Sequence, residues 1–575
     1  MKVLLVGINS KYIHTALGLR YVKEYAKQKG FQIELLETAV QTPILTLLAE
    51  VTAKKPDVVG LSVHIWNRNY VKEFASLLKK VLPKLRLVLG GPEVAYTSET
   101  VLREWSAVDY IVQGEGEEVF AELLQSFERN TDVPAYVAYR DAAEHIIANE
   151  GVAVLQDLNQ LPFPYPDLLA VIKEHKIIYY EASRGCPFSC SYCLSGISHK
   201  VRRRDLEKVV EDLAVFMRAE APLVKFVDRT YNLDENYYLP MMEYLAKANT
   251  NTLFHFEIKA DLLSDKAIQF FKTIPKGKFQ FEIGIQSTNR PTLSAIGRHN
   301  DFALLRRNIM LLLQAQNIHI HVDLIAGLPY EGLPEFAKSF NDVYELGADM
   351  VQLGFLKVLP GAAINATVKE HKMLSMDEPP YEILQTKYLS YADLRLLKVF
   401  EDAFEQTYNS GNFVNTMQYL VKIFDGSAFE LYKELALYWE KEGQFGIGHN
   451  AKGITEFIWR FVREKFADKS ETIREILRFD VFVNQTGWQP DWLNWQKAQI
   501  NDAIVEFWRD KERVNKYLPD YEFLTWREIQ KRHPIERFSY NIDKQISESS
   551  FYMVINENCG KKLVMIDPKD IRIGE

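Results

Sequence analysis

Residues 177–193 read IIYYEASRGCPFSCSYC, a β-rich run that leads directly into three cysteines. Cys186, Cys190 and Cys193 have the spacing CxxxCxxC on one expected loop. Thiolates are soft ligands that suit iron–sulfur clusters, and three on one short loop can hold three corners of a four-iron, four-sulfur cluster. The fourth iron is then open, which favours a catalytic cluster over an electron carrier with four protein ligands.

Structural zinc is the alternative for the same cysteines. His199 lies six residues beyond Cys193 and would complete a four-ligand site. A zinc-stabilised binding protein built on α/β modules therefore stays open from the residues alone. Inert core cysteines are less favoured, because nothing in a core requires this spacing. Cys559 stands alone in an expected turn and is not expected to be a ligand.

The β-rich run before the cysteines is the first of six that alternate with helical patterns. The runs with strand character are 176–186, 223–232, 253–262, 278–287, 318–329 and 350–361. The intervening helical patterns are 205–219, 235–248, 265–273, 303–316 and 335–346. Six strand–helix units predict a partial (β/α)6 barrel of the TIM type, with its chemistry at the carboxyl ends of the strands.

The chain before this barrel predicts a second α/β domain. Its apolar runs are 2–8, 31–37, 57–65, 86–91 and 109–117, with helical patterns at 19–29, 44–54 and 71–81. Continuous apolar strands between amphipathic helices indicate a doubly wound parallel sheet, which binds ligands at the carboxyl ends of its strands. Small and polar residues stand at those ends: Ser10, Ser62, Gly90, Gly91 and Gly114. No GxGxxG follows the first strand, so a dinucleotide site is poorly supported.

Composition shifts suggest where the domains meet. We expect the doubly wound domain at 1–130, a hairpin and proline-containing linker at 131–174, the barrel at 175–367 and a mainly helical domain at 368–575. A hairpin at 551–566 should close the last domain. Its tryptophans are expected to form a core, since large aromatic side chains usually supply burial; they include Trp439, Trp459, Trp488, Trp492 and Trp495.

Charge and hydropathy exclude several classes of protein. The net charge of -8 argues against general nucleic-acid binding, which needs clustered Lys and Arg. No apolar run approaches the roughly 20 residues that span a bilayer. Neither a cleavable signal peptide nor a disulfide framework is evident in a chain with four cysteines. The expectation is a cytoplasmic protein that does not enter membranes.

The cysteine loop, with Tyr192 just before its third cysteine, resembles the hallmark of the radical S-adenosylmethionine (radical SAM) superfamily. The resemblance covers about residues 175 to 365. It implies a [4Fe-4S] cluster whose open iron binds S-adenosylmethionine, and an electron donor such as flavodoxin or ferredoxin. By position in the barrel, it also implies that further residues hold S-adenosylmethionine: Asp228, Glu282, Gln286 and Gly327.

The N-terminal domain resembles the cobalamin-binding domain of cobalamin-dependent radical SAM enzymes, through the FVDRTYN, LGGPEV and QGEGE segments. This resemblance implies cobalamin near the five strand-end residues above. The DxHxxG motif that supplies a cobalt ligand in other cobalamin proteins is absent, and His14 has the wrong spacing for it. Residues from about 370 resemble an uncharacterised C-terminal domain found on one branch of these proteins.

The resemblance implies reductive cleavage of S-adenosylmethionine, hydrogen abstraction from a substrate between the two domains, and methyl transfer from cobalamin to an unactivated carbon. Radical cyclisation or oxidation, as in the anaerobic porphyrin ring cyclases, is the alternative within the same class. Methylthiolation of transfer RNA is less favoured, because no cysteine precedes Cys186. The substrate cannot be read from the sequence, since variable loops make the substrate contacts.

Overall fold

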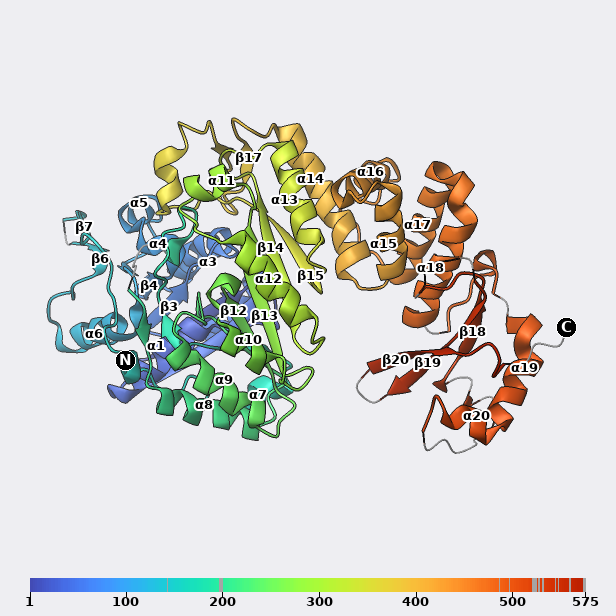
Figure 1. Cartoon of the computed structure of the whole chain (residues 1–575). Coiled ribbons are helices and arrows are strands. Elements are labelled where there is room, and N and C mark those ends of the chain that lie inside the picture. Colours follow the sequence, from blue (N-terminus) through green and yellow to red (C-terminus); the bar gives the residue numbers. More distant parts are fainter. Residues whose placement is uncertain are drawn as a thin grey trace. The chain divides into compact units, whose positions relative to one another are not determined.

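The computed structural model describes residues 1–141, 143–195, 200–485, 487–495, 497–519, 525, 528–529, 532–542, 544, 546, 548–557 and 560–571. Contacts divide the chain into two compact units, Met1–Leu394 and Arg395–Glu575. The first unit contains both α/β sheets (Figure 1). Among the described residues, none of the helices has the length and hydrophobicity required to cross a bilayer.

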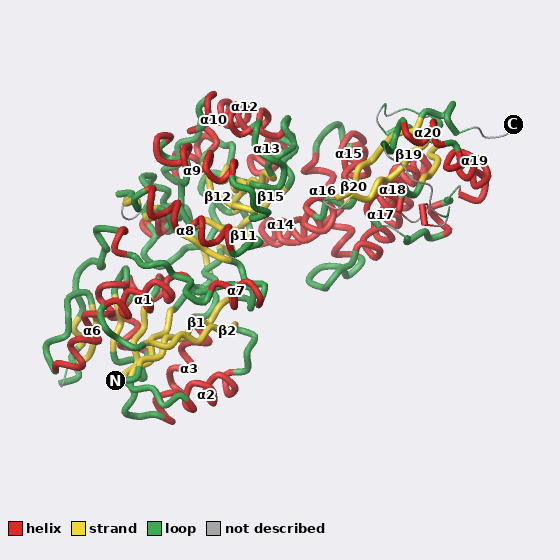
Figure 2. Tube along the Cα trace, turned by 90° about the horizontal axis from the view of Figure 1, so that it is seen from below, coloured by secondary structure: helices red, strands yellow, loops and turns green. Residues whose placement is uncertain are grey.

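The first sheet has the doubly wound arrangement that the sequence predicts. Its strands are β1 (Val3–Asn9), β2 (Ile33–Ala39), β3 (Val58–Ser62), β4 (Arg86–Gly90), β5 (Tyr110–Val112), β6 (Val137–Arg140) and β7 (Ile146–Ile147), in the order β2-β1-β3-β4-β5-β6-β7. The helices are α1 (Leu17–Gln28), α2 (Ile44–Ala53), α3 (Arg68–Val81), α4 (Pro92–Ala95), α5 (Ser98–Glu104) and α6 (Gly116–Arg129). In Figure 2, α1 and α6 lie on one side of β1 and β2, and α2 and α3 lie on the other.

Two hydrophobic cores explain why both faces of this sheet are covered. Leu4 and Val6 pack into the core that contains Phe74 of α3, whereas Val3 and Leu5 pack into the core that contains Phe120 of α6. Strand β1 is apolar from Val3 to Ile8, because alternate side chains enter opposite cores. The expected hairpin forms β6 and β7, and it extends this sheet antiparallel to β5. The sheet therefore continues beyond residue 130.

The second sheet is the expected six-stranded parallel array. Its order is β15-β14-β13-β12-β11-β8, formed by β8 (Ile178–Tyr180), β11 (Leu223–Phe226), β12 (Leu253–Ile258), β13 (Phe279–Gln286), β14 (His319–Ala326) and β15 (Met350–Phe355). The helices that accompany it are α7 (Leu168–Lys173), α8 (Leu206–Arg218), α9 (Glu235–Lys247), α10 (Asp265–Phe271), α11 (Arg290–Ala295), α12 (Phe302–Leu313) and α13 (Leu333–Tyr344). Short strands β9 (Ser183–Arg184) and β10 (Arg202–Arg203) pair beside the cysteine loop.

Strands β16 (Leu374–Ser375) and β17 (Ile383–Gln385) pair at the end of the first unit, and α14 (Tyr391–Phe404) crosses into the second. The second unit contains α15 (Val414–Ile423), α16 (Ala428–Lys441), α17 (Ala451–Lys465), α18 (Ser470–Asn484), α19 (Lys497–Arg509) and α20 (Lys511–Asn515). It ends in an antiparallel sheet of β18 (Ile535–Phe538), β19 (Ser550–Glu557) and β20 (Gly560–Ile566). The last two strands form the expected hairpin; β18 was not expected.

Trp439 is fully buried, and its indole N–H donates to Asp402 Oδ2 at 3.0 Å, as a core aromatic with a polar edge requires. The other four tryptophans each keep part of their surface exposed. Trp495 nevertheless packs against the hydrophobic core that contains Phe479 and Phe538. Trp459 and Trp492 stack with ring centroids 5.6 Å apart. His199 and Cys559 lie outside the described residues.

Candidate functional site

The three cysteines of the CxxxCxxC loop line one small cavity beside the barrel strands. All three thiols are free; Cys190 is buried, and Cys186 and Cys193 are partly buried. The cavity volume is about 190 Å³. Side chains from four neighbouring strands or the loops after them line the cavity with the cysteines: Thr230, Glu257, Lys259, Glu282, Gln286 and Asp323.

The cysteine loop is anchored to neighbouring loops. The Ser191 N–H donates to the Ile296 carbonyl at 2.9 Å, and the Ser191 carbonyl accepts from the Ile364 N–H at 2.8 Å. The Arg298 guanidinium lies against the cysteines, with Nη1 donating to Cys190 Sγ at 3.6 Å. This contact ties the cysteine loop to the segment that follows α11.

Asp228 is not among the described residues that line this cavity. Its carboxylate is 1% exposed and accepts hydrogen bonds from the Ala182 N–H at 3.0 Å and the Ser183 hydroxyl at 2.6 Å. Burial raises the pKa of Asp228 to about 7, against these hydrogen bonds. In this structure Asp228 therefore holds the segment that leads into the cysteine loop; contact with the methionine amine stays a prediction.

Glu282 of β13 lines the cavity and is in contact with His255 and Lys225 from the two preceding strands. Its Oε2 lies 3.0 Å from His255 Nε2 and 3.2 Å from Lys225 Nζ. Although burial acts in the opposite direction, the hydrogen bond from His255 and the charge of Lys225 lower the pKa of Glu282 to about 2. Glu282 is therefore ionised, whereas burial and the charge of Glu282 raise the pKa of neighbouring Asp323 to about 8.

Gln286 ends β13 in a strained conformation beside the cysteines. Its φ of 72° lies in the left-handed region, and the register between β13 and β14 shifts between Gly284 and Gln286. Gln286 Oε1 is buried without a hydrogen-bond partner among the described residues. Strain and an unused acceptor are tolerated together at ligand sites, where a ligand donor completes the contact.

These observations test whether the cavity fits a cluster and S-adenosylmethionine. Three free thiols that line one space could bind metal, and the side-chain oxygen of Gln286 is an unused hydrogen-bond acceptor beside them. Tyr192 also lines this space, and burial raises the pKa of its phenol. Thiolates suit an iron–sulfur cluster and the amide oxygen suits an amino or hydroxyl group, so the residues fit.

Gly327 is not brought to the cavity by the described contacts. Its φ is 93°, and a Cβ there would lie 2.6 Å from the Ile383 side chain of β17. A side chain at this turn would therefore clash with the neighbouring strand. A role of the Gly327 turn in binding S-adenosylmethionine stays a prediction.

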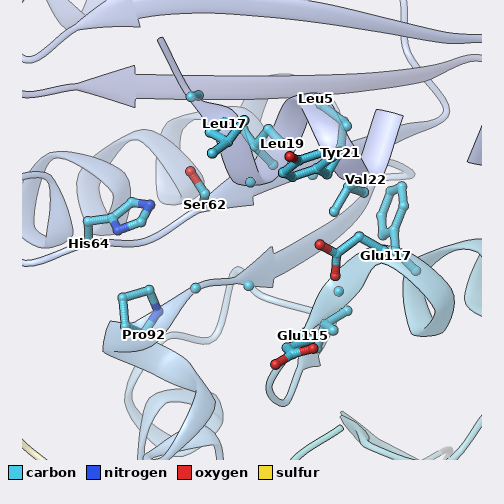
Figure 3. Close-up of a pocket in the computed structure, with 18 of the residues that line it drawn as sticks. Leu5, Leu17, Leu19, Tyr21, Val22, Ser62, His64, Pro92, Glu115 and Glu117 are labelled. Atoms are coloured by element: carbon cyan, nitrogen blue, oxygen red, sulfur yellow. The ribbon is translucent and has the colours of Figure 1, made fainter. Parts of the chain in front are cut away.

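A second cavity of about 520 Å³ opens at the carboxyl ends of the first sheet (Figure 3). Ser62, Gly90, Gly91 and Gly114 line it, as the sequence places them at strand ends. Ser10 is not among the described lining residues; its carbonyl accepts from the Gln41 amide at 3.0 Å. Apolar side chains between the sheet and helices α1 and α6 form the deeper wall: Leu5, Leu17, Leu19, Val22, Val88, Val112 and Phe120.

Tyr21 shows that this cavity fits a large ligand with polar groups. The side chain of Tyr21 lines the cavity and is 1% exposed, yet its hydroxyl has no hydrogen-bond partner among the described residues. Gly60 opens the same wall, because a Cβ there would lie 2.5 Å from Leu5. An apolar cleft with an unused hydroxyl fits the amphipathic tail of cobalamin.

An ion-pair cluster joins the first sheet to the barrel beside this cavity. Arg184, next to the cysteine loop, pairs with Glu115 at 3.0 Å, Glu117 at 2.9 Å and Glu181 at 2.7 Å. Arg202 pairs with Glu115 at 2.6 Å. The residues around Arg184 are mostly buried, so the cluster fixes the strand ends of one domain against the other.

Arg229 lines both cavities. It follows β11 in the segment between Asp228 and Thr230, and Thr230 Oγ1 lies 3.8 Å from Cys186 Sγ. Among the described residues, the Arg229 guanidinium forms its ion pair with Glu257, at 3.9 Å. The two cavities therefore meet at one cation that remains half exposed.

Sequence reasoning missed Tyr21, Arg229, Arg298 and Asp323. The sequence did contain a signal for Asp323. His321 and Asp323 are polar residues two positions apart in a strand, so they lie on the same face of it, and the neighbouring strand carries Glu282. Polar residues at this spacing indicate the inner face of a barrel. Tyr21 and Arg298 gave no such signal. Arg298 contacts Cys190, which lies 108 residues away in the chain.

Three family models match successive parts of the chain. Residues 3–124 match the B12 binding domain, residues 180–343 match the Radical SAM superfamily, and residues 369–555 match a protein of unknown function, DUF4080. The chain therefore combines a B12-binding domain, a radical SAM domain and a DUF4080 domain.

Curated relatives match more than half of this chain. The cobalamin-dependent radical SAM methyltransferase TokK of Streptomyces tokunonensis is 27% identical over 64% of this chain and 57% of its own length. An uncharacterised methyltransferase of Pyrococcus horikoshii, PH0819, is 22% identical over 64% of this chain and 81% of its own. An anaerobic magnesium-protoporphyrin IX monomethyl ester cyclase of Rubrivivax gelatinosus is 23% identical over 57% of this chain and 61% of its own length. The matches to TokK and the cyclase span little more than half of those proteins.

Solved structures share the fold. The cobalamin-dependent S-adenosylmethionine radical enzyme OxsB, solved with aqua-cobalamin and S-adenosylmethionine bound, aligns with a TM-score of 0.60 at 16% identity. The alignment covers 83% of this chain and 78% of OxsB. TsrM of Kitasatospora setae, solved with cobalamin and a [4Fe-4S] cluster, aligns with a TM-score of 0.56 at 16% identity, over 66% and 81% of the two chains.

Proposed function

We propose that this chain, which joins a B12-binding domain to a radical SAM domain, is a cobalamin-dependent radical SAM enzyme that methylates an unactivated carbon of its substrate. The observation that carries the proposal is the pair of neighbouring cavities in one compact unit, the first lined by the three cysteines and the second by the strand ends of the first sheet. Their shared residue is Arg229.

Cys186, Cys190 and Cys193 would hold the [4Fe-4S] cluster, and Tyr192, Glu282 and Gln286 border the space for S-adenosylmethionine. When bound, the cluster supplies the electron that cleaves S-adenosylmethionine, and cobalamin supplies a transferable methyl group. Arg298 contacts the Cys190 sulfur, and Gln286 Oε1 would be free to accept a hydrogen bond from a bound cofactor. The ionised Glu282 fixes Lys225 and His255 inside the barrel.

The boundary between the two cavities is where a substrate has access to both cofactors. Arg229 stands at this boundary with an incompletely paired guanidinium, which favours substrates that present a carboxylate or phosphate. Enclosing the substrate there also keeps water away from a reactive intermediate. Asp228 supports this arrangement, because it fixes the segment that connects β8 to the cysteines.

Methyl transfer is favoured over ring closure, because TokK and the Pyrococcus relative are named methyltransferases. Radical cyclisation is the second candidate, since the Rubrivivax relative is named a cyclase. Analysis of the product for a gain of one methyl group or for ring formation separates the two. A reducing, cytoplasmic location with flavodoxin or ferredoxin as the electron donor suits a site built on free thiols.

The test is anaerobic reconstitution of the full chain with iron, sulfide, cobalamin, S-adenosylmethionine and a low-potential reductant. We expect a brown protein that retains corrinoid after desalting and releases 5′-deoxyadenosine. Cys186→Ala, Cys190→Ala and Cys193→Ala should each reduce deoxyadenosine release to background, whereas Cys559→Ala, outside the CxxxCxxC loop, should not. A colourless protein that binds zinc in place of iron would refute the proposal.

A further inference from the structure

His64 places an imidazole at the edge of the larger cavity. It lies two residues after Ser62, and its ring extends toward the space between Ser62 and Pro92 (Figure 3). Neither ring nitrogen of His64 has a hydrogen-bond partner among the described residues. His14 has neither property. It is not among the described residues that line the cavity, and its Nδ1 lies 2.7 Å from the Tyr179 hydroxyl.

The His64 ring is held in one orientation by Trp66. The two rings stack with centroids 4.3 Å apart and planes 4° from parallel. Trp66 is itself fixed, because its indole N–H donates to the Ile8 carbonyl at 3.0 Å. A stacked ring gives up little rotational freedom when it binds a ligand, so the imidazole is preorganised.

The backbone around His64 is equally constrained. The His64 N–H donates to Asn67 Oδ1 at 2.8 Å, and the Asn67 amide donates to the Ile8 and Ser62 carbonyls at 2.8 and 3.0 Å. Gly91 packs against Val63, the residue before His64. The φ of Gly91 is 101°, and a Cβ on Gly91 would lie 2.6 Å from the Val63 carbonyl oxygen. The loop cannot move His64 away from the cavity without breaking these contacts.

We propose that His64 is the axial ligand which this chain supplies to the cobalt of a bound cobalamin. The inference rests on the proposed function, because it requires cobalamin in this cavity. Neutral imidazole is a ligand that first-row transition metals accept readily. The ligand would come from the loop after β3 and not from the loop after β1, where His14 is already engaged by Tyr179.

Electron paramagnetic resonance of the full chain loaded with cob(II)alamin tests this assignment. A nitrogen ligand splits each cobalt line into three when it is 14N and into two when it is 15N. Protein made with 15N-labelled histidine should therefore show the two-line pattern, and unlabelled protein the three-line pattern. Cobalamin's own base gives three lines in both preparations, so the labelling separates the two sources of nitrogen and needs no mutation.

His64→Ala should lose the two-line pattern while it retains corrinoid, and added imidazole should restore a nitrogen splitting. His14→Phe is the matched control and should keep the two-line pattern. The assignment is overturned if labelling leaves three lines or no splitting, or if His64→Ala keeps the two-line pattern. Bound corrinoid without histidine splitting contradicts this inference alone, whereas a chain that retains no corrinoid contradicts the proposed function as well.

Discussion

At the scale of single residues, buried carboxyl groups determine how the barrel responds to pH. Glu331 is fully buried and accepts hydrogen bonds from the Ser287 and Ser339 hydroxyls at 2.6 and 2.9 Å. No described cation lies within ion-pair distance of it. Burial raises the pKa of Glu331 to about 7, because the charged form loses its hydration.

The folded state therefore binds more protons at Glu331 than the unfolded state between about pH 4.5 and pH 7. A raised carboxyl pKa costs no stability below the unfolded value of 4.5; its cost grows as pH rises from there to the folded value of about 7 and is constant above it. Glu331→Gln, which mimics the protonated acid, should gain stability relative to the native chain by up to about 3 kcal/mol at pH 8 and about zero at pH 4. Thermal melting of both proteins across this range measures the difference. A difference that does not change with pH would contradict the prediction.

At the scale of elements, glycine within a strand decides whether the larger cavity exists. Gly60 lies in the middle of β3, where glycine normally weakens a strand. Here it leaves room between Leu5 of β1 and Phe120 of α6, whose ring would lie 3.5 Å from a Cβ at this position. The cavity thus depends on a missing side chain in the middle of an interior strand.

Gly60→Ala should therefore weaken cobalamin binding by about 5- to 150-fold, since overpacking costs about 1–3 kcal/mol at the cavity wall. Titration with cobalamin, followed by its absorption, gives the dissociation constant. Gly448→Ala is the matched control, because no neighbouring atom lies within 4 Å of a Cβ at Gly448. Equal affinity in the Gly60→Ala and native proteins would show that this wall does not contact the ligand.

At the scale of the whole molecule, coupling of the two α/β domains depends on charge. Arg184 is in contact with three carboxylates, of which Glu117 keeps 4% and Glu181 12% of its side chain exposed. Removing one partner of a buried ion pair leaves the others uncompensated, which costs more than the pair contributes. The cluster lies beside the cysteine loop and lines the larger cavity, so it connects both candidate cofactor sites.

Arg184→Met should destabilise the first unit by about 3–5 kcal/mol. It should also speed proteolysis in the linker at residues 155–169, as the domains separate more often. Denaturation and limited proteolysis measure these effects. Arg103→Met breaks an ion pair with Glu99 in which both side chains are about two-thirds exposed, and it should change stability by no more than about 1 kcal/mol. Similar losses in the two variants would show that the Arg184 cluster does not join the domains.

The sequence alone determined the elements and the chemistry of the cluster loop. Short apolar runs that alternate with helical patterns predicted both parallel sheets, and the CxxxCxxC spacing indicated an iron–sulfur site, because these signals are local along the chain. Seven of the expected cofactor residues line a cavity: Ser62, Gly90, Gly91, Gly114, Tyr192, Glu282 and Gln286. Those at strand ends meet because parallel strands end at one edge of a sheet.

Only the tertiary structure decided which side chains face each other across the domains. In the tertiary structure the Asp228 carboxylate accepts hydrogen bonds from the segment before the cysteines. Arg229 lines both cavities, and His64 lines the larger one. Gly327 packs close to Ile383 of β17, and the Ser10 carbonyl accepts a hydrogen bond from Gln41. These outcomes depend on packing between residues far apart in the chain, and local patterns of polarity carry no information about such partners.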